Sequence, residues 1–254
     1  ASSFKREPIR ASELIIGMKC GGSDGLSGIT ANPTVGAFSD KLISMGGSTI
    51  LTEVPEMFGA EELLMNRCET EDLFNQTVAL VNDFKNYFKS HNQTIYENPS
   101  PGNKEGGLTT LEEKSLGCIH KGGHSEVTAV YDYAKQVESK QGLVIMDTPG
   151  NDPSSVAAMV AGGCQIVVFS TGRGTPTGNP LAPVIKITGN KVTFANMSDN
   201  IDIDASPYIY GTKTMTELGD ELMKEIKEVA DGKLTKAEAL GYTEMAIARV
   251  CNYM

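Results

Sequence analysis

The sequence lacks the patterns that assign a chain to a secreted, disulfide-bonded or membrane-spanning class. Its 254 residues include five cysteines, an odd number without a Cys-x-x-Cys pair, so neither a disulfide framework nor a structural zinc knot is expected. No apolar run approaches the roughly 20 residues that span a bilayer, and the opening residues ASSFKREPIR contain no signal-peptide core. We therefore expect a protein of the reducing cytoplasm that does not bind membranes.

Positive charge is also scarce. The formal net charge is −10, and the 22 lysine and arginine residues form no basic run interleaved with aromatics. Long-range repulsion therefore disfavours nucleic acid or an anionic membrane as a partner. A small anionic substrate is still compatible with this balance, because a few cations focused in a cleft can outweigh a distant negative surface. The three histidines form no HExxH pattern, so a histidine-based zinc site is not expected.

Short apolar runs bounded by glycines alternate with amphipathic stretches along the chain. The apolar runs predict strands at residues 12–19, 48–53, 142–148 and 165–171. The amphipathic stretches predict helices at residues 32–45, 70–90, 109–121, 153–161 and 214–230. The first of these helices is expected to start with Asn32 as its N-cap and Pro33 at its first position.

This order of elements predicts one α/β domain. Strand, glycine loop, helix and strand form a βαβ unit, whose crossover should be right-handed. The predicted architecture is a doubly wound, mostly parallel sheet flanked by helices, a Rossmann-like variant. Residues 1–11 are polar and are expected to be a linker or the tail of an upstream domain, and residues 12–254 a single α/β domain.

Polar loops follow the predicted strands, and the chemistry should lie there. In open parallel sheets, ligands collect beyond the carboxyl ends of the strands, where loops and helix N-termini offer unpaired N–H groups. We therefore expect Cys20, Glu53, Asp147 and Thr171 to lie at neighbouring strand ends on one edge of the sheet. The loops concerned are CGGSDG, EVPEMFGAE, MDTPGND and STGRGTP, with NPSPGNK as a fifth candidate.

Two residues in these loops are suited to binding, although each also has a plain structural interpretation. Cys20 lies where a strand meets a glycine turn, and it could offer a thiolate to iron or simply be a small buried residue. Arg173 stands between two glycines, and it could grip a carboxylate with two hydrogen bonds or be a solvated loop arginine. The glycines of TGRGTPTG do not have the spacing of a dinucleotide fingerprint, so NAD binding is not expected.

Taken together, the loops resemble the altronate/galactarate dehydratase family over nearly the whole chain. The matching segments are CGGSDGLSGITANP at 20–33, E-x-PE-x-FGAE at 53–61, NPSPGNKEGGLTTLEEKSLG at 98–117, MDTPGNDP at 146–153, TGRGTP at 171–176 and DID at 202–204. The MDTPGNDP and NPSPGNK loops are most similar to those of members that dehydrate altronate. A related branch, the sulfolactate sulfo-lyases, shares CGGSDG, GGLTT-x-EEKSLG and TGRG, so a second elimination reaction stays open.

The resemblance implies a metal-dependent lyase, a hydro-lyase that converts a sugar acid such as altronate to a 2-keto-3-deoxy acid. Iron(II) is the implied metal, with manganese(II) as the alternative. The resemblance also implies a longer enzyme, in which an N-terminal domain or a separate small subunit precedes this region, and we expect a homo-oligomer. The rival interpretations are a sulfolactate sulfo-lyase-like subunit and a non-catalytic domain that binds sugar acids or drives oligomerisation.

Within that reaction, loop residues receive hypothetical roles. The predicted metal ligands are Cys20, Asp24 and Glu53. The predicted proton-transfer residues are Glu56, Lys104 and Lys114, of which the two lysines could equally be surface charges. The predicted substrate-binding residues are Ser23, Asn103, Lys104, Thr148, Thr171, Arg173 and Thr175.

Overall fold

A single parallel sheet organises the chain. The computed structural model describes residues 3–138 and 141–248, so residues 1–2 of the predicted tail and residues 249–254 of the predicted domain lie outside the described residues. Seven strands pair in the order β3-β4-β2-β1-β5-β6-β7, and each pairing is parallel. The strands are β1 (Ile15–Cys20), β2 (Ser48–Leu51), β3 (Val127–Tyr131), β4 (Gly142–Met146), β5 (Ile166–Ser170), β6 (Val184–Thr188) and β7 (Ile203–Asp204).

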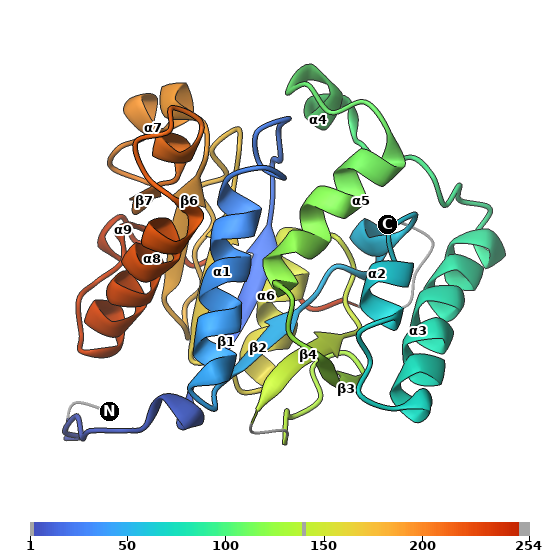
Figure 1. Ribbon diagram of the computed structural model, residues 1–254, viewed down its shortest axis with the longest axis horizontal. Coiled ribbons are helices and arrows are strands. Elements are labelled where there is room, and N and C mark those ends of the chain that lie inside the picture. The colour runs from blue at the N-terminus through green and yellow to red at the C-terminus, as the bar shows by residue number, and fades with distance from the viewer. Residues whose placement is uncertain (1–2, 139–140, 249–254) are drawn as a thin grey trace.

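Helices cover both faces of this sheet, which confirms the predicted α/β class (Figure 1). Helices α1 and α8 contribute Phe38 and Leu222 to the apolar cluster on one face, and α6 contributes Val156 and Met159 to the cluster on the other. Among the described residues, no helix combines the length and apolar character needed to cross a membrane. The helices are α1 (Ala31–Ser44), α2 (Glu62–Met65), α3 (Glu71–Ser90), α4 (Pro101–Glu105), α5 (Leu111–Ile119), α6 (Asp152–Ala161), α7 (Lys191–Asn196), α8 (Met215–Ala230) and α9 (Lys236–Ala239).

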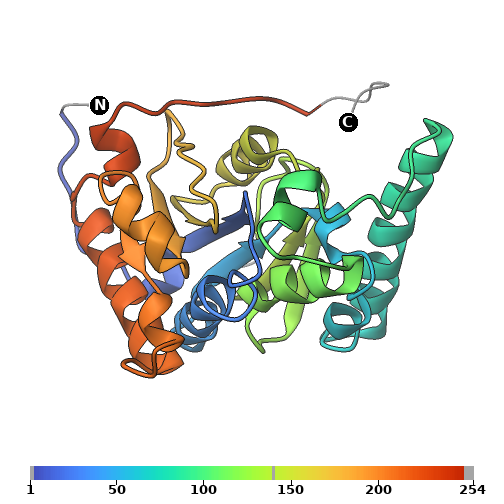
Figure 2. The same ribbon diagram turned by 90° about the horizontal axis from the view of Figure 1, so that it is seen from above.

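Strand β1 lies in the middle of the sheet, and the chain extends the sheet from it in two directions. Strands β2, β4 and β3 lie on one side of β1, and β5, β6 and β7 lie on the other. The order therefore reverses between β1 and β5, which is where ligands bind in open α/β sheets. After α9 the chain runs along the α6 side of the sheet (Figure 2), where the backbone N–H of Ala248 donates to Tyr133 Oη at 2.9 Å.

The structure departs from the sequence-based prediction in three respects. Strands β3, β6 and β7 were not predicted, although each pairs in the sheet. The short helices α2, α4, α7 and α9 were not predicted either. The prediction of Asn32 as an N-cap is wrong, because α1 begins at Ala31 with Thr30 as its N-cap. The Asn32 side chain is buried instead and donates to the carbonyl of Gly117 at 2.9 Å, while its Oδ1 accepts from Ser170 Oγ. This asparagine therefore ties α1 to α5 and β5.

Candidate active site

The end of β1 places two adjacent side chains on opposite faces of the sheet, because successive residues of a strand alternate. The Nζ atom of Lys19 lies on the α6 side, 2.9 Å from Oδ1 of Asp152 and 3.0 Å from the carbonyl oxygen of Gly150. The Sγ atom of Cys20 lies on the α5 side, 3.7 Å from Sγ of Cys118. One strand end thus supplies a cation to one face and a thiol to the other.

Glu53, which follows β2, connects the two faces. It is fully buried and has a φ of 70°, a left-handed conformation that non-glycine residues rarely adopt outside constrained sites. Its Oε2 accepts from Lys19 Nζ at 2.6 Å, and its Oε1 accepts from the Cys20 N–H at 3.0 Å and lies 3.1 Å from Lys121 Nζ. Burial raises the pKa of Glu53, but the ammonium groups of Lys121 and Lys19 outweigh burial and lower the pKa to about 2. Glu53 is therefore a carboxylate at neutral pH.

Cys118 and Lys121 reach Cys20 from α5 and from the turn that follows it. A Cβ on Gly28 would lie 2.8 Å from the Cα of Gly117, so the absence of a side chain lets α5 lie directly against the loop after β1. Lys121 Nζ donates to Cys20 Sγ at 3.1 Å and to Cys118 Sγ at 2.9 Å. The hydrogen bond with Cys118 lowers the pKa of the Cys20 thiol to about 6, and the same contact raises the pKa of Cys118.

Cys20, Glu53 and Cys118 form a group of three buried donors, which we call the three-donor group. Their ligand atoms all lie within 4.8 Å of one another, so the three could hold one metal ion. Lys121 is fully buried and its Nζ contacts all three residues. An internal ammonium therefore offsets part of the negative charge of the group, and a divalent cation would have to displace it.

A cavity of about 320 Å³ opens beside this cluster. Of the three-donor group, Cys20 reaches the cavity wall. The wall is formed by Cys20, Gly21, Gly22, Ser23, Glu56, Asn98, Ser100, Gly102, Asn103, Lys114, Gly150, Asp152 and Arg173. A larger cavity of about 630 Å³ adjoins it, since Glu56, Asn98, Ser100 and Gly150 line both. The wall combines thiol, carboxylate, ammonium and guanidinium groups, which suits a small anionic ligand.

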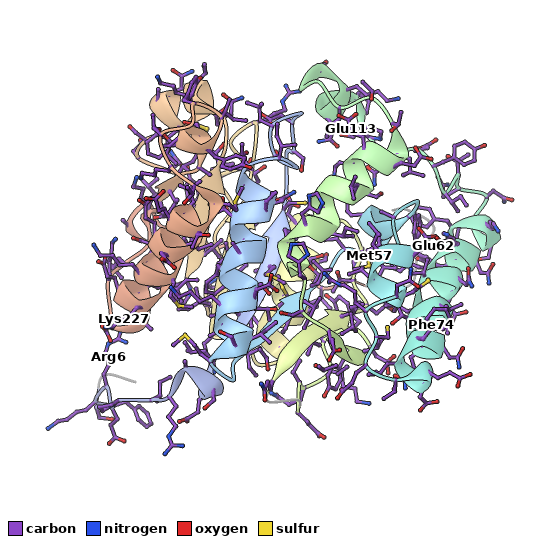
Figure 3. The ribbon with its side chains drawn as sticks, in the orientation of Figure 1. Arg6, Met57, Glu62, Phe74, Glu113 and Lys227 are labelled. Atoms are coloured by element: carbon purple, nitrogen blue, oxygen red, sulfur yellow. The ribbon has the colours of Figure 1, made fainter. Side chains whose placement is uncertain are left out.

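Glu56 and Lys114 form a buried ion pair in this wall, through Oε2 of the glutamate. The other oxygen of Glu56 accepts from Asn98 Nδ2 at 3.3 Å. Lys114 is 5 % exposed and points inward, whereas its neighbour Glu113 lies at the outer end of α5 (Figure 3). Burial disfavours the charge on Lys114, but the carboxylate of Glu56 raises its pKa well above the ordinary value. Lys114 is thus a fixed cation of the cavity and not a surface charge.

Three of the predicted substrate-binding residues, Ser23, Asn103 and Arg173, line the cavity. Asn103 is buried and donates through Nδ2 to the carbonyl oxygen of Ser23 at 2.9 Å, which holds α4 against the loop after β1. Arg173 is half-exposed, and its Nη1 donates to the carbonyl oxygen of Gly102 and pairs with Glu105 at 3.0 Å. The guanidinium therefore lies at the rim, between α4 and the loop after β5.

The structure does not bring the other predicted substrate-binding residues to the cavity wall. Lys104 is exposed and outside the lining. Thr148 is buried, and its Oγ1 accepts from the backbone N–H of Glu53 at 2.7 Å. Thr171 is buried as well, and its Oγ1 accepts from the N–H of Thr175 at 3.0 Å. These contacts fix the loops on which wall residues lie.

Asp24 lies outside the three-donor group, in which Cys118 takes the place predicted for it. Its Oδ1 accepts from the N–H groups of Leu26 and Ser27 at 3.1 and 3.0 Å, and its Oδ2 accepts from Asn190 Nδ2 at 2.9 Å. The carboxylate therefore shapes its own loop, and the structure groups Cys118, not Asp24, with Cys20 and Glu53.

Sequence reasoning missed four residues of this site, namely Lys19, Cys118, Lys121 and Asp152. A usable signal existed for Lys19, because it ends an apolar strand, and a lysine in such a place requires a buried partner. A second signal was the spacing of Lys114, Cys118 and Lys121, which puts the three on one face of a helix. The proximity of this face to Cys20 had no sequence signal, because it depends on tertiary packing.

The fold and the cavity together define an α/β domain with an enzyme-like site at the carboxyl edge of its sheet. The switch in strand order lies next to β1, and the buried charges converge there from several loops. The chain belongs to the D-galactarate/altronate dehydratase family, whose C-terminal region matches residues 11–252. This match confirms the resemblance carried by the loop motifs.

Three relatives show how the match is distributed. The altronate dehydratase of Escherichia coli (strain K12) is 53 % identical over 243 residues, covering 96 % of this chain and 48 % of that protein. The altronate dehydratase of Bacillus subtilis (strain 168) is 50 % identical over 247 residues, 97 % of this chain and 49 % of that protein. The (2R)-sulfolactate sulfo-lyase subunit beta of Chromohalobacter salexigens is 38 % identical over 253 residues, covering 98 % of this chain and 65 % of that subunit. The chain therefore spans about half the length of the altronate dehydratases it matches.

Proposed function

We propose that the protein is a hydro-lyase that dehydrates a sugar acid such as altronate to a 2-keto-3-deoxy acid. The observation that carries this proposal is the cavity at the carboxyl edge of β1, whose wall holds two carboxylates, a buried ammonium and a guanidinium. Identity of 50 % or more to two altronate dehydratases over nearly the whole chain supports altronate as the substrate.

The reaction requires three things of the protein. A proton must leave C2, a hydroxide must leave C3, and the negative charge that develops on the carboxylate must be stabilised. Lys114 supplies a fixed positive charge in the wall. Both hydrogen bonds of the Arg173 side chain within the described chain use Nη1, so the rest of its five-donor fork is free to bind the substrate carboxylate.

The three-donor group suits a divalent metal by its chemistry. Two thiol sulfurs 3.7 Å apart and a nearby carboxylate are a mixed soft and hard donor set, which favours iron(II) over manganese(II). Cys20, Cys118 and Glu53 would hold the ion, with Lys121 withdrawn from the position it occupies. A bound ion would act as a Lewis acid toward the substrate oxygens. Thr148 would keep Glu53 in place by its hydrogen bond to the Glu53 backbone.

The setting of the enzyme is also part of the proposal. The described cysteines Cys20, Cys68, Cys118 and Cys164 are all free thiols, which supports a reducing, cytoplasmic location. The greater length of the relatives supports a further N-terminal domain or a separate small subunit. We also propose that the enzyme assembles as a homo-oligomer and that its substrate is a small anion. We propose no nucleic acid or membrane as a partner and no NAD as a cofactor.

A second function, sulfolactate sulfo-lyase activity, has the support of one specific observation. The (2R)-sulfolactate sulfo-lyase subunit matches 98 % of this chain at 38 % identity. A non-catalytic role in binding sugar acids or in oligomerisation is the remaining alternative.

An assay of the full-length protein with iron(II), under reducing conditions, distinguishes the dehydratase, the sulfo-lyase and the non-catalytic role. The panel should include aldonates, aldarates and sulfolactate. Release of a 2-keto acid without sulfite supports the dehydratase, and release of sulfite supports the sulfo-lyase. The absence of any product from the whole panel would refute catalysis.

A further inference from the structure

Two carboxylates line the cavity, and they differ in how their oxygens are used. In Glu56, Oε2 pairs with Lys114 and Oε1 accepts from Asn98 Nδ2 at 3.3 Å. In Asp152, the first residue of α6, Oδ1 pairs with Lys19 at 2.9 Å. Within the described chain, Oδ2 of Asp152 has no hydrogen-bond partner. Asp152 is thus the carboxylate of the wall with a free oxygen.

Lys19 fixes the position of this carboxylate. Its Nζ is fully buried and also donates to the Cys20 carbonyl at 2.9 Å, to the Gly150 carbonyl at 3.0 Å and to Glu53 at 2.6 Å. These acceptors lie at or beyond the ends of β1, β2 and β4, so the position of the Lys19 ammonium is fixed whatever Asp152 does. Oδ1 of Asp152 is therefore anchored, and the orientation of Oδ2 follows from it.

Gly21 leaves room for the free oxygen. A Cβ at Gly21 would lie 2.5 Å from Oδ2 of Asp152 and 2.9 Å from its Cγ, closer than real Cβ atoms approach. Both residues line the cavity, and the Asp152 side chain is 25 % exposed. The carboxylate therefore lies against a bare backbone at the end of β1 and stays open to a ligand.

We infer that Asp152 is a catalytic residue of the elimination, which exchanges a proton with the substrate through Oδ2. The inference rests on the proposed function. Burial raises the pKa of Asp152 although Lys19 opposes this, so a proton that it accepts is retained more readily than on a solvated aspartate.

The proposed step balances within the substrate and this side chain. Oδ2 takes the C2 proton, and the electron pair of the C2–H bond becomes the C2–C3 double bond. The C3–O bond breaks with its electron pair on the departing oxygen. That hydroxide takes the proton from Asp152 and leaves as water, which returns Asp152 to a carboxylate. The enol product then becomes the 2-keto acid.

The test compares Asp152→Asn with Asp147→Asn in the full-length enzyme loaded with iron(II). Both aspartates follow β4 and both have a raised pKa, but Asp147 is outside the cavity lining, so it is the matched control. The substrate is whichever acid of the panel the wild type consumes. We expect Asp152→Asn to lower kcat by about 100-fold or more, the usual contribution of a positioned acid or base. Asp147→Asn should stay within about 3-fold of the wild type.

Two further readouts separate chemistry from structure. Asp152→Asn should keep its iron content and bind the unreacted acid in calorimetry with a Kd within about 3-fold of the wild-type KM. Asp152→Glu, which keeps the carboxylate but moves it, should retain more activity than Asp152→Asn. The inference is overturned if Asp152→Asn turns over like the control, or if it loses substrate binding and iron together with activity. A wild type that consumes no acid of the panel would overturn the proposed function as well.

Discussion

Asp147 offers a sharp test of the electrostatics of this fold, because removing its charge should stabilise the protein. It follows β4, and its backbone N–H donates to the carbonyl oxygen of Tyr131 at 2.8 Å. Its Oδ1 is buried and has no hydrogen-bond partner among the described residues. Burial, together with the charges of Asp132 and Asp83, raises the pKa of Asp147 to about 6. The folded state therefore binds a proton more tightly than the unfolded chain does.

The sign and size of the effect follow from this pKa. A rise from 3.8 to about 6 corresponds to at most about 3 kcal/mol of unfavourable free energy for the carboxylate in the folded state. Because the side chain is only partly buried, solvent screening reduces this to about 1–2 kcal/mol. The cost is fully present above the folded-state pKa and disappears as pH falls through about 6 toward 3.8.

Thermal unfolding of the full-length protein measures this cost. We expect Asp147→Asn to raise the Tm of the transition that contains this domain by about 2–8 °C at pH 7, since 1 kcal/mol shifts a domain of this size by about 2–4 °C. The difference should shrink at pH 4.5. The exposed Asp199→Asn is the control and should change stability by less than about 0.5 kcal/mol. A variant that is destabilised at pH 7, or equally stabilised at both pH values, would refute the reasoning.

Three further predictions concern the site. Glu53→Gln should destabilise the protein by about 3–5 kcal/mol in calorimetry, because it leaves buried ammonium groups without their carboxylate. As the control, loss of the exposed ion pair between Glu221 and Lys213 should cost about 1 kcal/mol or less. Cys118→Ser in the full-length enzyme should lower the iron content measured by elemental analysis, since a hydroxyl is a poor soft-metal ligand; wild-type iron content would remove Cys118 from the ligand set. Arg173→Lys should lower kcat/KM by about 10-fold or more with the fold intact, because lysine cannot form a planar two-point contact; unchanged kinetics would return Arg173 to a rim contact with Glu105.

The sequence was sufficient to predict the class of fold and the edge of the sheet that carries the site. Four glycine-bounded apolar runs correspond to β1, β2, β4 and β5, which are the strands at the centre of the sheet. Strands β3, β6 and β7 lie toward the edges of the sheet. Strand β3 is half-buried and β7 has only two residues, so their patterns are weak. Strand β6 is fully buried, but its short apolar run is interrupted by Lys186. The loops after central strands placed Cys20 and Glu53 together, because parallel strands end at the same edge.

The rest of the site could not be predicted, because it depends on packing between elements far apart in the chain. Cys118 lies beside Cys20 only because Gly28 and Gly117 allow α5 to approach the loop after β1. Lys104 was favoured by its motif, but it lies one position beyond the residue of α4 that faces inward, Asn103. A motif therefore identifies a loop, while the choice of the functional residue within it requires the direction of each side chain.

The central place of β1 in the sheet has a consequence for how the protein is made. Ile16 of β1 pairs with Ile166 of β5, 150 positions later in the chain. At a synthesis rate of about 5–20 residues per second, the ribosome needs roughly 8–30 s to supply that partner. During this time the middle strand of the sheet has one open edge, to which other nascent chains can pair. Slow emergence of β5 should therefore limit the yield of folded protein, and the cluster around Lys19 is complete only once Asp152, which precedes β5, has also been made.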